Sequence, residues 1–362
     1  MAVNTDFWRN KKVLITGHTG FKGSWLTLWL QQLGAQVIGY SLSPNTAPNL
    51  YEQAHVSSGI TSIFGDIRNA EKLSQAVSEY QPQIVFHLAA QALVRDSYLD
   101  PVSTYTTNVM GSLNVLEAIR NTPSIKAAVM ISSDKCYENK ESSVSFTEDD
   151  PMGGHDPYSS SKGCMELLIA SYRSSFFSSS SKTTTAIASA RAGNVIGGGD
   201  WAQDRLVPDI IHAIKNNKPV ILRYPQAIRP WQHVLEPLSA YMLLAEKLYE
   251  NGNTYAESWN FGPNSNSAKT VNWVANYLVK ASGKNVDVLI DSAAQLHESQ
   301  QLKLNCTKAR QSLNWFPRWD LNTTLNKVLE WSMADQTDKR LLCLKQISEY
   351  STSEISELCN AI

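Results

Sequence analysis

Six short apolar runs divide the first half of the chain, and each has the length of a buried β-strand. These runs cover residues 12–16, 36–40, 60–64, 84–91, 127–131 and 185–191. Between them lie stretches in which apolar side chains recur every three or four residues, the period of an α-helix. Strands that alternate with helices predict an α/β fold, in which a doubly wound parallel sheet carries helices on both faces.

The alternation becomes irregular after residue 192. Helical spacing recurs at residues 238–249, 271–281, 308–313 and 323–333, and a last amphipathic segment covers residues 339–358. We expect that last segment to pack on the outside of the molecule. We also expect residues 1–192 to form a Rossmann-type domain, and residues 193–362 to form mainly a smaller lobe with some chain crossing back.

The bulk composition excludes several classes of function. The chain has 362 residues, 18% of them charged, and a formal net charge of −1, so it carries no electrostatic footprint for nucleic acid or an anionic membrane. Residues 1–10 hold no apolar signal core, and no apolar run approaches membrane-spanning length. The five cysteines are scattered without metal-ligand spacing, which predicts reduced thiols in a cytoplasmic protein and no metal site.

A glycine-rich loop joins the first strand to a helix. Glycines at this point let the backbone approach a phosphate, and the free N–H groups of the helix N-terminus point at the anion. The spacing is G-x-x-G-x-x-G, and the strand and helix on either side favour a dinucleotide site over a simple tight turn. The loop residues that we expect to contact the cofactor are Gly17, Thr19, Gly20, Phe21, Lys22 and Gly23.

The ends of the second and third strands bear on the choice of cofactor. Residues 40–42 are Tyr, Ser and Leu, which supply neither the acid that usually binds the adenosine ribose nor the Arg that suits a 2′-phosphate. The missing Arg favours NAD. After the third strand, Asp66 is placed to accept a hydrogen bond from an adenine amino group, and Asp66 and Ile67 are both expected cofactor contacts. Asp66 is alternatively an N-cap for the helix from Ala70, and both roles are compatible.

The fourth run ends in small residues, which let a flat ring or a pyrophosphate lie against the backbone. From it we expect four cofactor contacts, at Leu88, Ala89, Ala90 and Gln91. His87 lies inside the apolar part of that run, so we interpret it as a core histidine. A long helix is predicted over residues 100–120, with Asn108 in its middle. Asn is mildly unfavourable there, so Asn108 either faces solvent or does polar work inside, where it would join the cofactor contacts.

Polar groups gather around the fifth strand. Ser133, Asp134 and Lys135 follow it closely, at the sheet edge where open parallel sheets bind ligands. Tyr158 and Lys162 are four residues apart in a predicted helix, so the phenol and the ammonium share one helix face. An ammonium close to a phenol favours phenolate and lowers the phenol pKa, which makes a base able to take a proton from a sugar hydroxyl.

Two further stretches carry ligand-binding potential. Residues 197–199 are three consecutive glycines beside Asn194 and Asp200, a flexible polar loop in which a ligand could be held. Arg223, Arg229 and His233 give local positive charge, which suits a diphosphate or is simply a solvated turn.

Taken in order, these motifs resemble those of the extended short-chain dehydrogenase/reductases. Within that superfamily the chain resembles the nucleotide-sugar 4,6-dehydratases, and among them the branch that acts on CDP-glucose. The segments that carry this closer resemblance are residues 17–25, 132–138, 150–154, 191–201 and 229–234. The resemblance extends over about residues 10–335.

The resemblance implies a reaction in which NAD is reduced and then reoxidised. Tyr158, assisted by Lys162 and Ser133, removes the proton of the sugar 4-hydroxyl while NAD takes the C4 hydride. The ketone acidifies C5–H, water leaves from C6 with Asp134 as the acid, and hydride returns to C6. Asp134 must then be protonated, which requires a raised pKa. Lys135 stands where the dTDP-glucose branch has an acidic C5 base, so it either abstracts that proton with a depressed pKa or stabilises the enolate.

The resemblance also sets expectations about ligands and assembly. Residues 1–192 are expected to bind the dinucleotide and residues 193–362 mainly the nucleotide sugar, with CDP-glucose as the substrate. The substrate-binding residues that we expect are Arg95, Asn194, Arg205, Leu206, Arg229 and His297. Relatives pair through two helices, so a homodimer is expected here through residues 100–120 and 158–172.

Two other functions share part of this pattern. A nucleotide-sugar 4-epimerase keeps the Ser and the Tyr-x-x-x-Lys pattern but needs no acid and base for C6 and C5, so Asp134 and Lys135 favour the dehydratase. A non-catalytic NAD-binding relative often loses the Tyr or the Lys, and this chain keeps both.

Overall fold

The computed structural model of the chain describes residues 3–139, 145–178, 184–291 and 302–354. Among these residues seven parallel strands form one sheet in the order β11-β6-β5-β4-β1-β2-β3. The sheet strands are β1 (Lys12–Thr16), β2 (Gln36–Ser41), β3 (Thr61–Phe64), β4 (Ile84–His87), β5 (Ala127–Ile131), β6 (Ala186–Arg191) and β11 (Ser258–Asn260). The α/β prediction with a doubly wound parallel sheet is confirmed.

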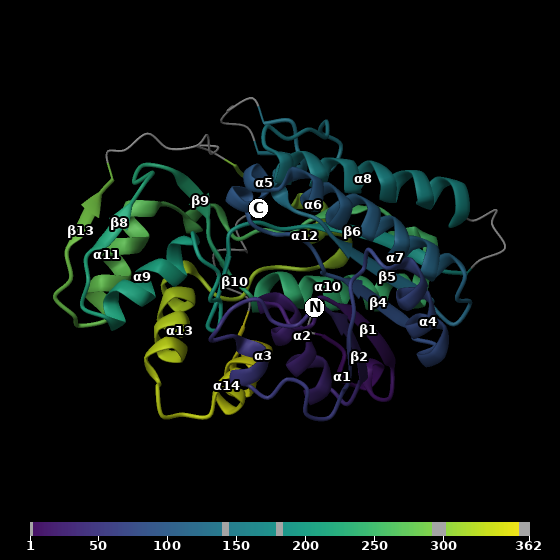
Figure 1. Cartoon of the computed structure of the whole chain (residues 1–362), viewed down its shortest axis with the longest axis horizontal. Coiled ribbons are helices and arrows are strands. Elements are labelled where there is room, and N and C mark those ends of the chain that lie inside the picture. The colour runs from purple at the N-terminus through teal and green to yellow at the C-terminus, as the bar shows by residue number, and fades with distance from the viewer. Residues whose placement is uncertain (1–2, 140–144, 179–183, 292–301, 355–362) are drawn as a thin grey trace.

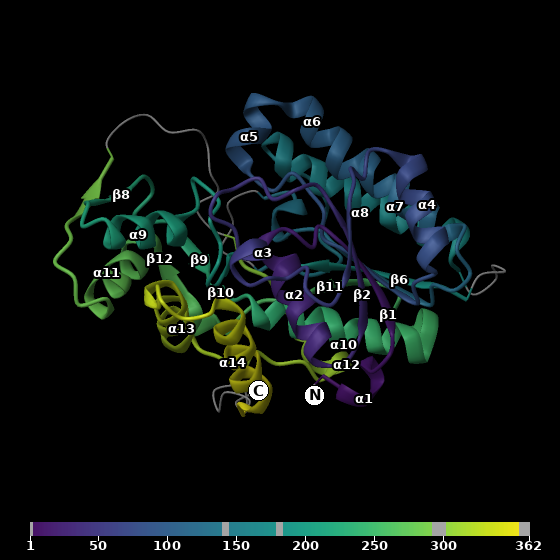
Figure 2. The same ribbon diagram turned by 60° about the horizontal axis from the view of Figure 1, so that its bottom comes forward.

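Helices cover both faces of this sheet, as Figures 1 and 2 show. The helices of the chain are α1 (Thr5–Trp8), α2 (Phe21–Gln32), α3 (Leu50–Gln53), α4 (Ala70–Tyr80), α5 (Val94–Leu99), α6 (Pro101–Tyr105), η1 (Thr106–Met110), α7 (Gly111–Arg120), η2 (Asp134–Cys136), α8 (Pro157–Phe176), α9 (Leu206–Lys215), α10 (Leu235–Asn251), η3 (Gly252–Tyr255), η4 (Ser265–Ser267), α11 (Val271–Ala281), α12 (Thr307–Leu313), α13 (Leu321–Met333) and α14 (Lys339–Thr352). In Figure 2, α4, α7 and α8 lie above the sheet, and α2 and α10 lie below it. Each layer buries its apolar side chains in its own core.

The chain crosses from the second half back to the sheet. After β6 it returns with α10, which packs on β5 and β6, and then adds β11 at the sheet edge. Helix α14 packs against α2, where Tyr350 meets Trp29 with ring centroids 5.7 Å apart. The expected helix at 339–358 is thus present from Lys339 to Thr352, and residues after 354 lie outside the described part.

Helices α9, α11 and α13 and strands β8, β9 and β13 form a smaller group on the left of Figure 1. Helices α9, α11 and α13 share a separate apolar core. The short strands of this half are β7 (Val195–Ile196), β8 (Val220–Leu222), β9 (Ile228–Pro230), β10 (Gln232–His233), β12 (Ala268–Thr270) and β13 (Val288–Ile290). They pair in twos, β7 with β10, β8 with β13 and β9 with β12.

Two predicted elements differ from the observed ones. The run at 84–91 forms a strand only to His87, because the small residues that follow leave the sheet as a loop. The helix expected at 100–120 is interrupted at its centre by a turn of π-helix, η1, which holds Asn108. Such π-turns redirect one side chain and recur at functional sites.

The strand order fixes where a ligand fits. Thr16, the last residue of β1, lies beside Tyr40 of β2 and His87 of β4, so β1 is the point where the chain changes direction across the sheet. Ligands of open parallel sheets bind at this switch point, outside the carboxyl ends of the strands. The glycine loop begins at the next residue, Gly17.

Candidate functional site

The carboxyl end of β5 and the start of α8 bring the predicted reacting groups together. Ser133, two residues after the end of β5, donates a hydrogen bond from its Oγ to Asp134 Oδ1 over 3.0 Å. A second hydrogen-bonding interaction links Ser133 to the Tyr158 phenol and lowers the phenol pKa. Ser133 therefore stands between the expected acid and the expected base.

The Asp134 carboxyl lies in a buried environment. It is 3% exposed, and burial raises its pKa, against the opposing charges of Lys135, Lys22 and Arg229. The raised pKa that an acid at this position requires is therefore present. The carboxyl also packs directly on Gly193, where an added Cβ would lie 1.6 Å from Oδ2. Gly193 is a site residue that our sequence analysis did not identify.

Tyr158 and Lys162 share one buried face of α8, but the phenol pKa differs from our expectation. Burial raises the pKa of Tyr158 to about 12, and the charge of Asp134 adds to the rise, while Arg205 opposes it. Burial lowers the pKa of Lys162 to about 8. The Lys162 ammonium donates to the Ile131 carbonyl over 3.4 Å and toward Met165 Sδ over 3.7 Å. The prediction of a lowered phenol pKa is therefore wrong, because burial raises it.

Lys135 is the second residue of the short helix η2 and directly follows the acid. Its side chain is half-buried, and its backbone N–H donates to Ser133 Oγ over 3.2 Å. Its charge lowers the pKa of Asp134. Lys135 therefore lies near the reacting groups in a position that suits either a base or an electrostatic role.

The glycine loop has the backbone shape of a phosphate cradle. Gly17 has φ +79°, and an added Cβ there would lie 2.8 Å from the Ala89 nitrogen, so only glycine fits. An added Cβ on Gly23 would lie 2.1 Å from the Gly17 carbonyl oxygen. Gly20 caps α2 without a side chain, so no cap covers the N–H groups at the start of this 12-residue helix. These features fit a dinucleotide pyrophosphate.

Lys22, an expected cofactor contact, also lies near enough to the reacting groups for their charges to affect its pKa. Its ammonium lies 6.0 Å from the centre of the Tyr241 ring. Burial lowers the pKa of Lys22 to about 8, and the charges of Arg205, Asp134 and Lys162 act on it. Tyr241 of α10 is fully buried, and its hydroxyl has no hydrogen-bond partner among the described residues. The sequence did not single out the Tyr241 hydroxyl, because Tyr241 lies among the regularly spaced apolar residues of a helix.

The loop after β4 is held by Asn108. Its Oδ1 accepts from the Gln91 N–H over 2.9 Å, and its Nδ2 donates to the Gln91 carbonyl and to Ser161 Oγ. Asn108 thus does polar work inside the molecule, one of the two possibilities that we considered. The loop residues Leu88, Ala89 and Ala90 are half-buried along the same edge.

His87 is a buried core histidine, which confirms our interpretation of it. Its two ring nitrogens bond to Thr16 Oγ1 at 2.7 Å and to Ser112 Oγ at 2.9 Å.

The structure does not place Asp66 at the N-cap of the helix that begins at Ala70. The N-cap of α4 is Asn69, whose side chain accepts from the Lys72 N–H, so Asp66 is not the cap. The Asp66 carboxylate instead pairs with Arg68, with 2.6 Å between the closest atoms. Ile67, next to it, is buried in the core.

Two of the predicted substrate residues lie near the acid and the base. Arg205 pairs with Asp200 at 2.9 Å, and its charge lowers the pKa of Tyr158. Arg229 is buried and lowers the pKa of Asp134. Asn194 follows Gly193 with φ +50°, and Leu206 begins α9 directly after Arg205.

The other predicted substrate residues lie farther out or are not described. Arg95 of α5 pairs with Asp204 at 3.5 Å, and both side chains are partly exposed to solvent. Arg223 pairs with the same Asp204 at 2.5 Å. His297 lies outside the described residues.

His233 contradicts the positive charge that we assigned to it. It is fully buried and packs edge-on against the Trp25 and Trp319 rings, with centroids 6.0 Å and 4.8 Å away. Burial lowers its pKa to about 3, so the imidazole is neutral at physiological pH. Local positive charge in this region comes from the arginines.

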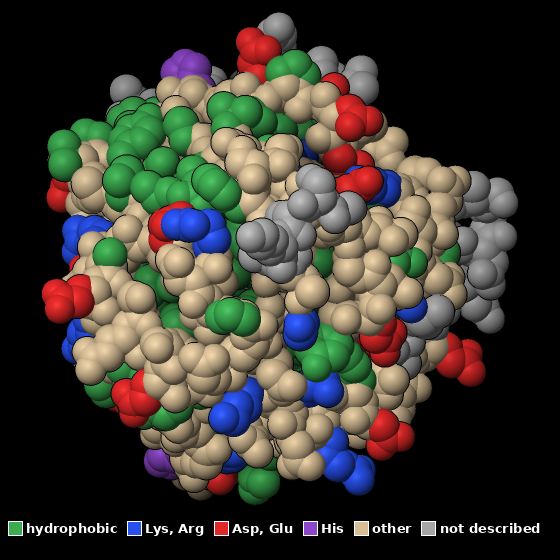
Figure 3. Space-filling model, turned by 90° about the vertical axis from the view of Figure 1, so that its right-hand side faces the viewer, with side chains coloured by type: hydrophobic (Ala, Val, Ile, Leu, Met, Phe, Trp, Pro, Cys, Tyr) green, Lys and Arg blue, Asp and Glu red, His purple; other side chains and the backbone are tan. Residues whose placement is uncertain are grey.

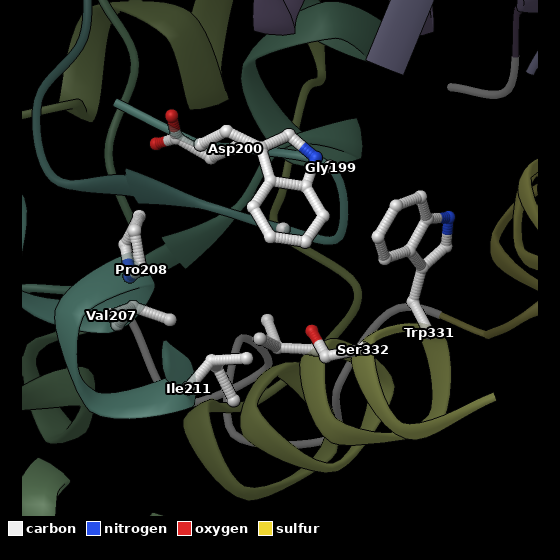
Figure 4. Close-up of a pocket in the computed structure, with 10 residues that line it drawn as sticks. Gly199, Asp200, Val207, Pro208, Ile211, Trp331 and Ser332 are labelled. Carbon is white, nitrogen blue, oxygen red and sulfur yellow. The ribbon is translucent and has the colours of Figure 1, made fainter. Parts of the chain in front are cut away.

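A small pocket lies behind the loop that carries Asp200. Apolar side chains of α9 and α13 line it together with the glycine loop of residues 197–199. Figure 4 shows Val207, Ile211 and Ser332 facing the space near Trp331, while the Asp200 carboxylate points away from Trp331. The pocket therefore adjoins the loop that holds Arg205 but does not contain the reacting groups.

Comparison with known proteins gives consistent relatives. Residues 14–328 match the family model described as GDP-mannose 4,6 dehydratase. A curated relative, the CDP-glucose 4,6-dehydratase of Salmonella typhimurium, is 48% identical over 97% of this chain and 99% of its own length. The UDP-glucose 4-epimerase of Rhizobium meliloti is 25% identical over 89% of this chain and 97% of its own length.

A solved structure shares the fold. The dTDP-glucose 4,6-dehydratase of Bacillus anthracis, in complex with NAD, aligns with a TM-score of 0.74 at 23% identity, over 92% of this chain and 99% of that one. At this identity the likeness establishes the fold. No helix in the part of the chain that the structure describes has both the length and the apolar character needed to cross a bilayer.

Proposed function

Because the chain belongs to the GDP-mannose 4,6-dehydratase family, we propose that it removes water from CDP-glucose to give CDP-4-dehydro-6-deoxyglucose, with NAD as its cofactor. The reaction class is that of a hydro-lyase. The observation that carries the proposal is the buried Asp134 carboxyl beside Ser133 and Tyr158, because loss of a C6 hydroxyl needs an acid whose proton is retained near neutral pH.

NAD fits the residues at the switch point of the sheet. The pyrophosphate would lie on the backbone of residues 17–23, and the loop held by Asn108 would face the rings. Asp66 and Ile67 would lie toward the adenosine. When bound, NAD supplies an acceptor for the C4 hydride and a donor of hydride to C6.

The first proton transfer belongs to Tyr158. Its phenol oxygen accepts the proton of the 4-hydroxyl, and Ser133 holds that hydroxyl through its Oγ. Because burial favours the neutral phenol, cationic groups must favour phenolate during the reaction. We assign that work to two cations among the described residues. Arg205 lowers the phenol pKa, and Lys162 lies on the same helix face as Tyr158.

The second transfer belongs to Asp134 and Lys135. Asp134 gives its proton to the C6 hydroxyl, so that water leaves with the carbon–oxygen bond electrons. In one role, Lys135 is the base that takes the C5 proton. Its alternative role is to hold positive charge beside the enolate oxygen.

The nucleotide part would be held by residues of the second half. Arg205 and Arg229 are the cations nearest the reacting groups, and a diphosphate is the anion that suits them. Asn194 and Leu206 would contact the substrate from the loops beside them, and Arg95 and His297 complete the proposed set.

A 4-epimerase is the competing function, and product analysis separates the two. We would incubate the purified protein with NAD and CDP-glucose and analyse the product by mass spectrometry and NMR. A dehydratase gives a product lighter by one water, with a C6 methyl group. An epimerase gives a product of unchanged mass with inverted C4. The same assay with dTDP-, UDP- and GDP-sugars should give slower turnover than CDP-glucose.

We also propose that two copies pair through the helices beside the site. Exposed apolar side chains gather along α5, α6, η1 and α8, at Leu99, Val102, Met110 and Leu167. Figure 3 shows hydrophobic side chains clustered at its upper left. Single exposed apolar residues are ordinary, but a contiguous patch is typical of an interface. Sedimentation should give a dimer mass, and Val102→Glu should give a monomer.

A further inference from the structure

A buried ion pair lies directly behind the reacting groups. Glu166 of α8 is 2% exposed and one helical turn after Lys162. Its Oε2 is 2.8 Å from a guanidinium nitrogen of Arg191, which is also buried. In addition, Glu166 accepts hydrogen bonds from the Ser132 hydroxyl and, over 2.7 Å, from the Ser189 hydroxyl. The Ser258 hydroxyl of β11 lies 3.5 Å from Oε2 as a fourth donor. One carboxylate thus has donors from β6, from β11 and from the residue that follows β5.

These contacts connect the elements that carry the acid and the base. Ser132 directly precedes Ser133 and Asp134 at the end of β5. Arg191 ends β6, two residues before Gly193, which packs on the Asp134 carboxyl. Glu166 itself extends the helix face that carries Tyr158 and Lys162.

Arg191 is fixed in turn by groups behind the site. It donates to the Tyr137 hydroxyl over 2.7 Å and to the Glu148 carbonyl over 3.1 Å. The Tyr137 hydroxyl donates to Asn260 Oδ1 over 2.7 Å. The pair therefore has little freedom to move relative to the strand ends.

We propose that Glu166, held by Arg191, is a positioning residue that fixes the Tyr158–Lys162 helix face against the Ser133–Asp134 strand end. The inference rests on the proposed dehydratase function and assigns a further residue to it. A buried ion pair is often no more stabilising than apolar side chains of the same volume. Stability alone therefore does not explain the placement of this pair.

The charges around Lys162 indicate an additional effect of Glu166. The groups that face it are Glu166 on its own helix, Cys136 on η2, His87 on β4 and Lys22 on α2. Burial keeps the His87 imidazole and the Cys136 thiol neutral, and Lys22 is another cation. Glu166 is charged, because its hydrogen bonds and Arg191 hold its pKa below the usual value. It is therefore the anion that favours protonated Lys162.

The test is Glu166→Gln, which keeps the shape and removes the charge. We expect kcat to fall about 10- to 100-fold, the size of loss that misplacement by an ångström produces. The KM for CDP-glucose and the affinity for NAD, measured by quenching of tryptophan fluorescence, should change less than about threefold. If loss of ammonium limits the rate at high pH, that limb of the kcat profile should move to lower pH.

Matched variants separate positioning from folding. Glu246→Gln makes the same change at a buried carboxyl of α10 that bonds to Trp8 and Asn4, and should leave kcat unchanged. If Glu166→Gln does not fold, two variants that each remove one hydrogen bond take its place. Ser132→Ala, beside the acid, should lower kcat several-fold more than Ser189→Ala.

The outcomes are distinct from failure of the proposed function. Lower melting temperature with unchanged kcat and pH profile in Glu166→Gln would overturn the inference, as would equal effects of Ser132→Ala and Ser189→Ala. If the wild-type protein instead epimerises C4, the proposed function fails. The Glu166 comparison then uses the rate of C4 oxidation, followed by absorbance of the reduced cofactor, and the same results decide it.

Discussion

Replacing Gly193 with alanine should displace the Asp134 carboxyl and disable the acid, although Asp134 itself is not substituted. An added Cβ would lie 1.6 Å from Asp134 Oδ2 and 2.1 Å from its Cγ. Since carbon and oxygen atoms pack at about 3.5 Å, the carboxyl must move by about 2 Å. The backbone at Gly193 is not in the left-handed region that favours glycine, so the clash with Asp134 is the main obstacle.

The expected consequences follow from that displacement. Overpacking of this kind costs roughly 1–3 kcal/mol of stability. Displacement of a general acid by more than an ångström should lower the rate of product formation about 10²-fold or more. C4 oxidation does not use the acid, so reduced cofactor should still appear in a single turnover, and the block should fall at elimination.

A double-mutant cycle tests the reasoning. In an Asp134→Ala background the clashing atoms are gone, so Gly193→Ala should cost less than about 0.5 kcal/mol by chemical denaturation. Gly262→Ala serves as a control, because the nearest atom to its added Cβ is Cys306 Sγ at 3.3 Å, and it should keep near-normal activity. A fully active Gly193→Ala enzyme, or equal destabilisation in both backgrounds, would refute the proposed contact.

Three further predictions address the other groups. Tyr158→Phe keeps the ring packing but removes the proton acceptor, so kcat should fall ~10²–10⁴-fold with an unchanged melting temperature, and unchanged kcat would assign Tyr158 to structure. Lys135→Met should stop elimination while cofactor reduction continues; Lys135→Arg should do the same if Lys135 is the C5 base, and a fully active Lys135→Arg enzyme would leave it an electrostatic role. Burial raises the pKa of Glu246 to about 7, so the folded state holds this proton longer than the unfolded state, and stability falls as pH rises from about 4.5 to 7. Glu246→Gln should remove that fall, on the order of 2–3 kcal/mol, in melts compared at pH 5 and pH 8, and parallel curves for both proteins would contradict it.

The sequence predicted the parts of the fold that depend on local pattern. The strands at Lys12–Thr16 and Ala127–Ile131 and the helix that carries Tyr158 and Lys162 lie where apolar periodicity put them. Their order along the chain also implied one sheet edge, so Ser133, Asp134 and Tyr158 were expected to meet.

What the sequence missed depends on contacts between distant segments. His233 reads as a basic residue, but two tryptophans from α2 and the loop before α13 enclose it and keep it neutral. The effect of Lys162 on Tyr158 was judged from spacing alone, whereas the depth of burial raises the phenol pKa. Gly193 looks like any loop glycine until Asp134 is placed against it.

The most direct test of the proposed reaction follows one hydrogen atom. Incubation with NAD and CDP-glucose that carries deuterium at C4 should give a 4-keto-6-deoxy product with the deuterium at C6, because the same hydride is removed and returned within one site. NMR of the product reads the position of the label. Deuterium lost to solvent, or reduced cofactor accumulating in step with product, would contradict the internal transfer on which the dehydratase assignment depends.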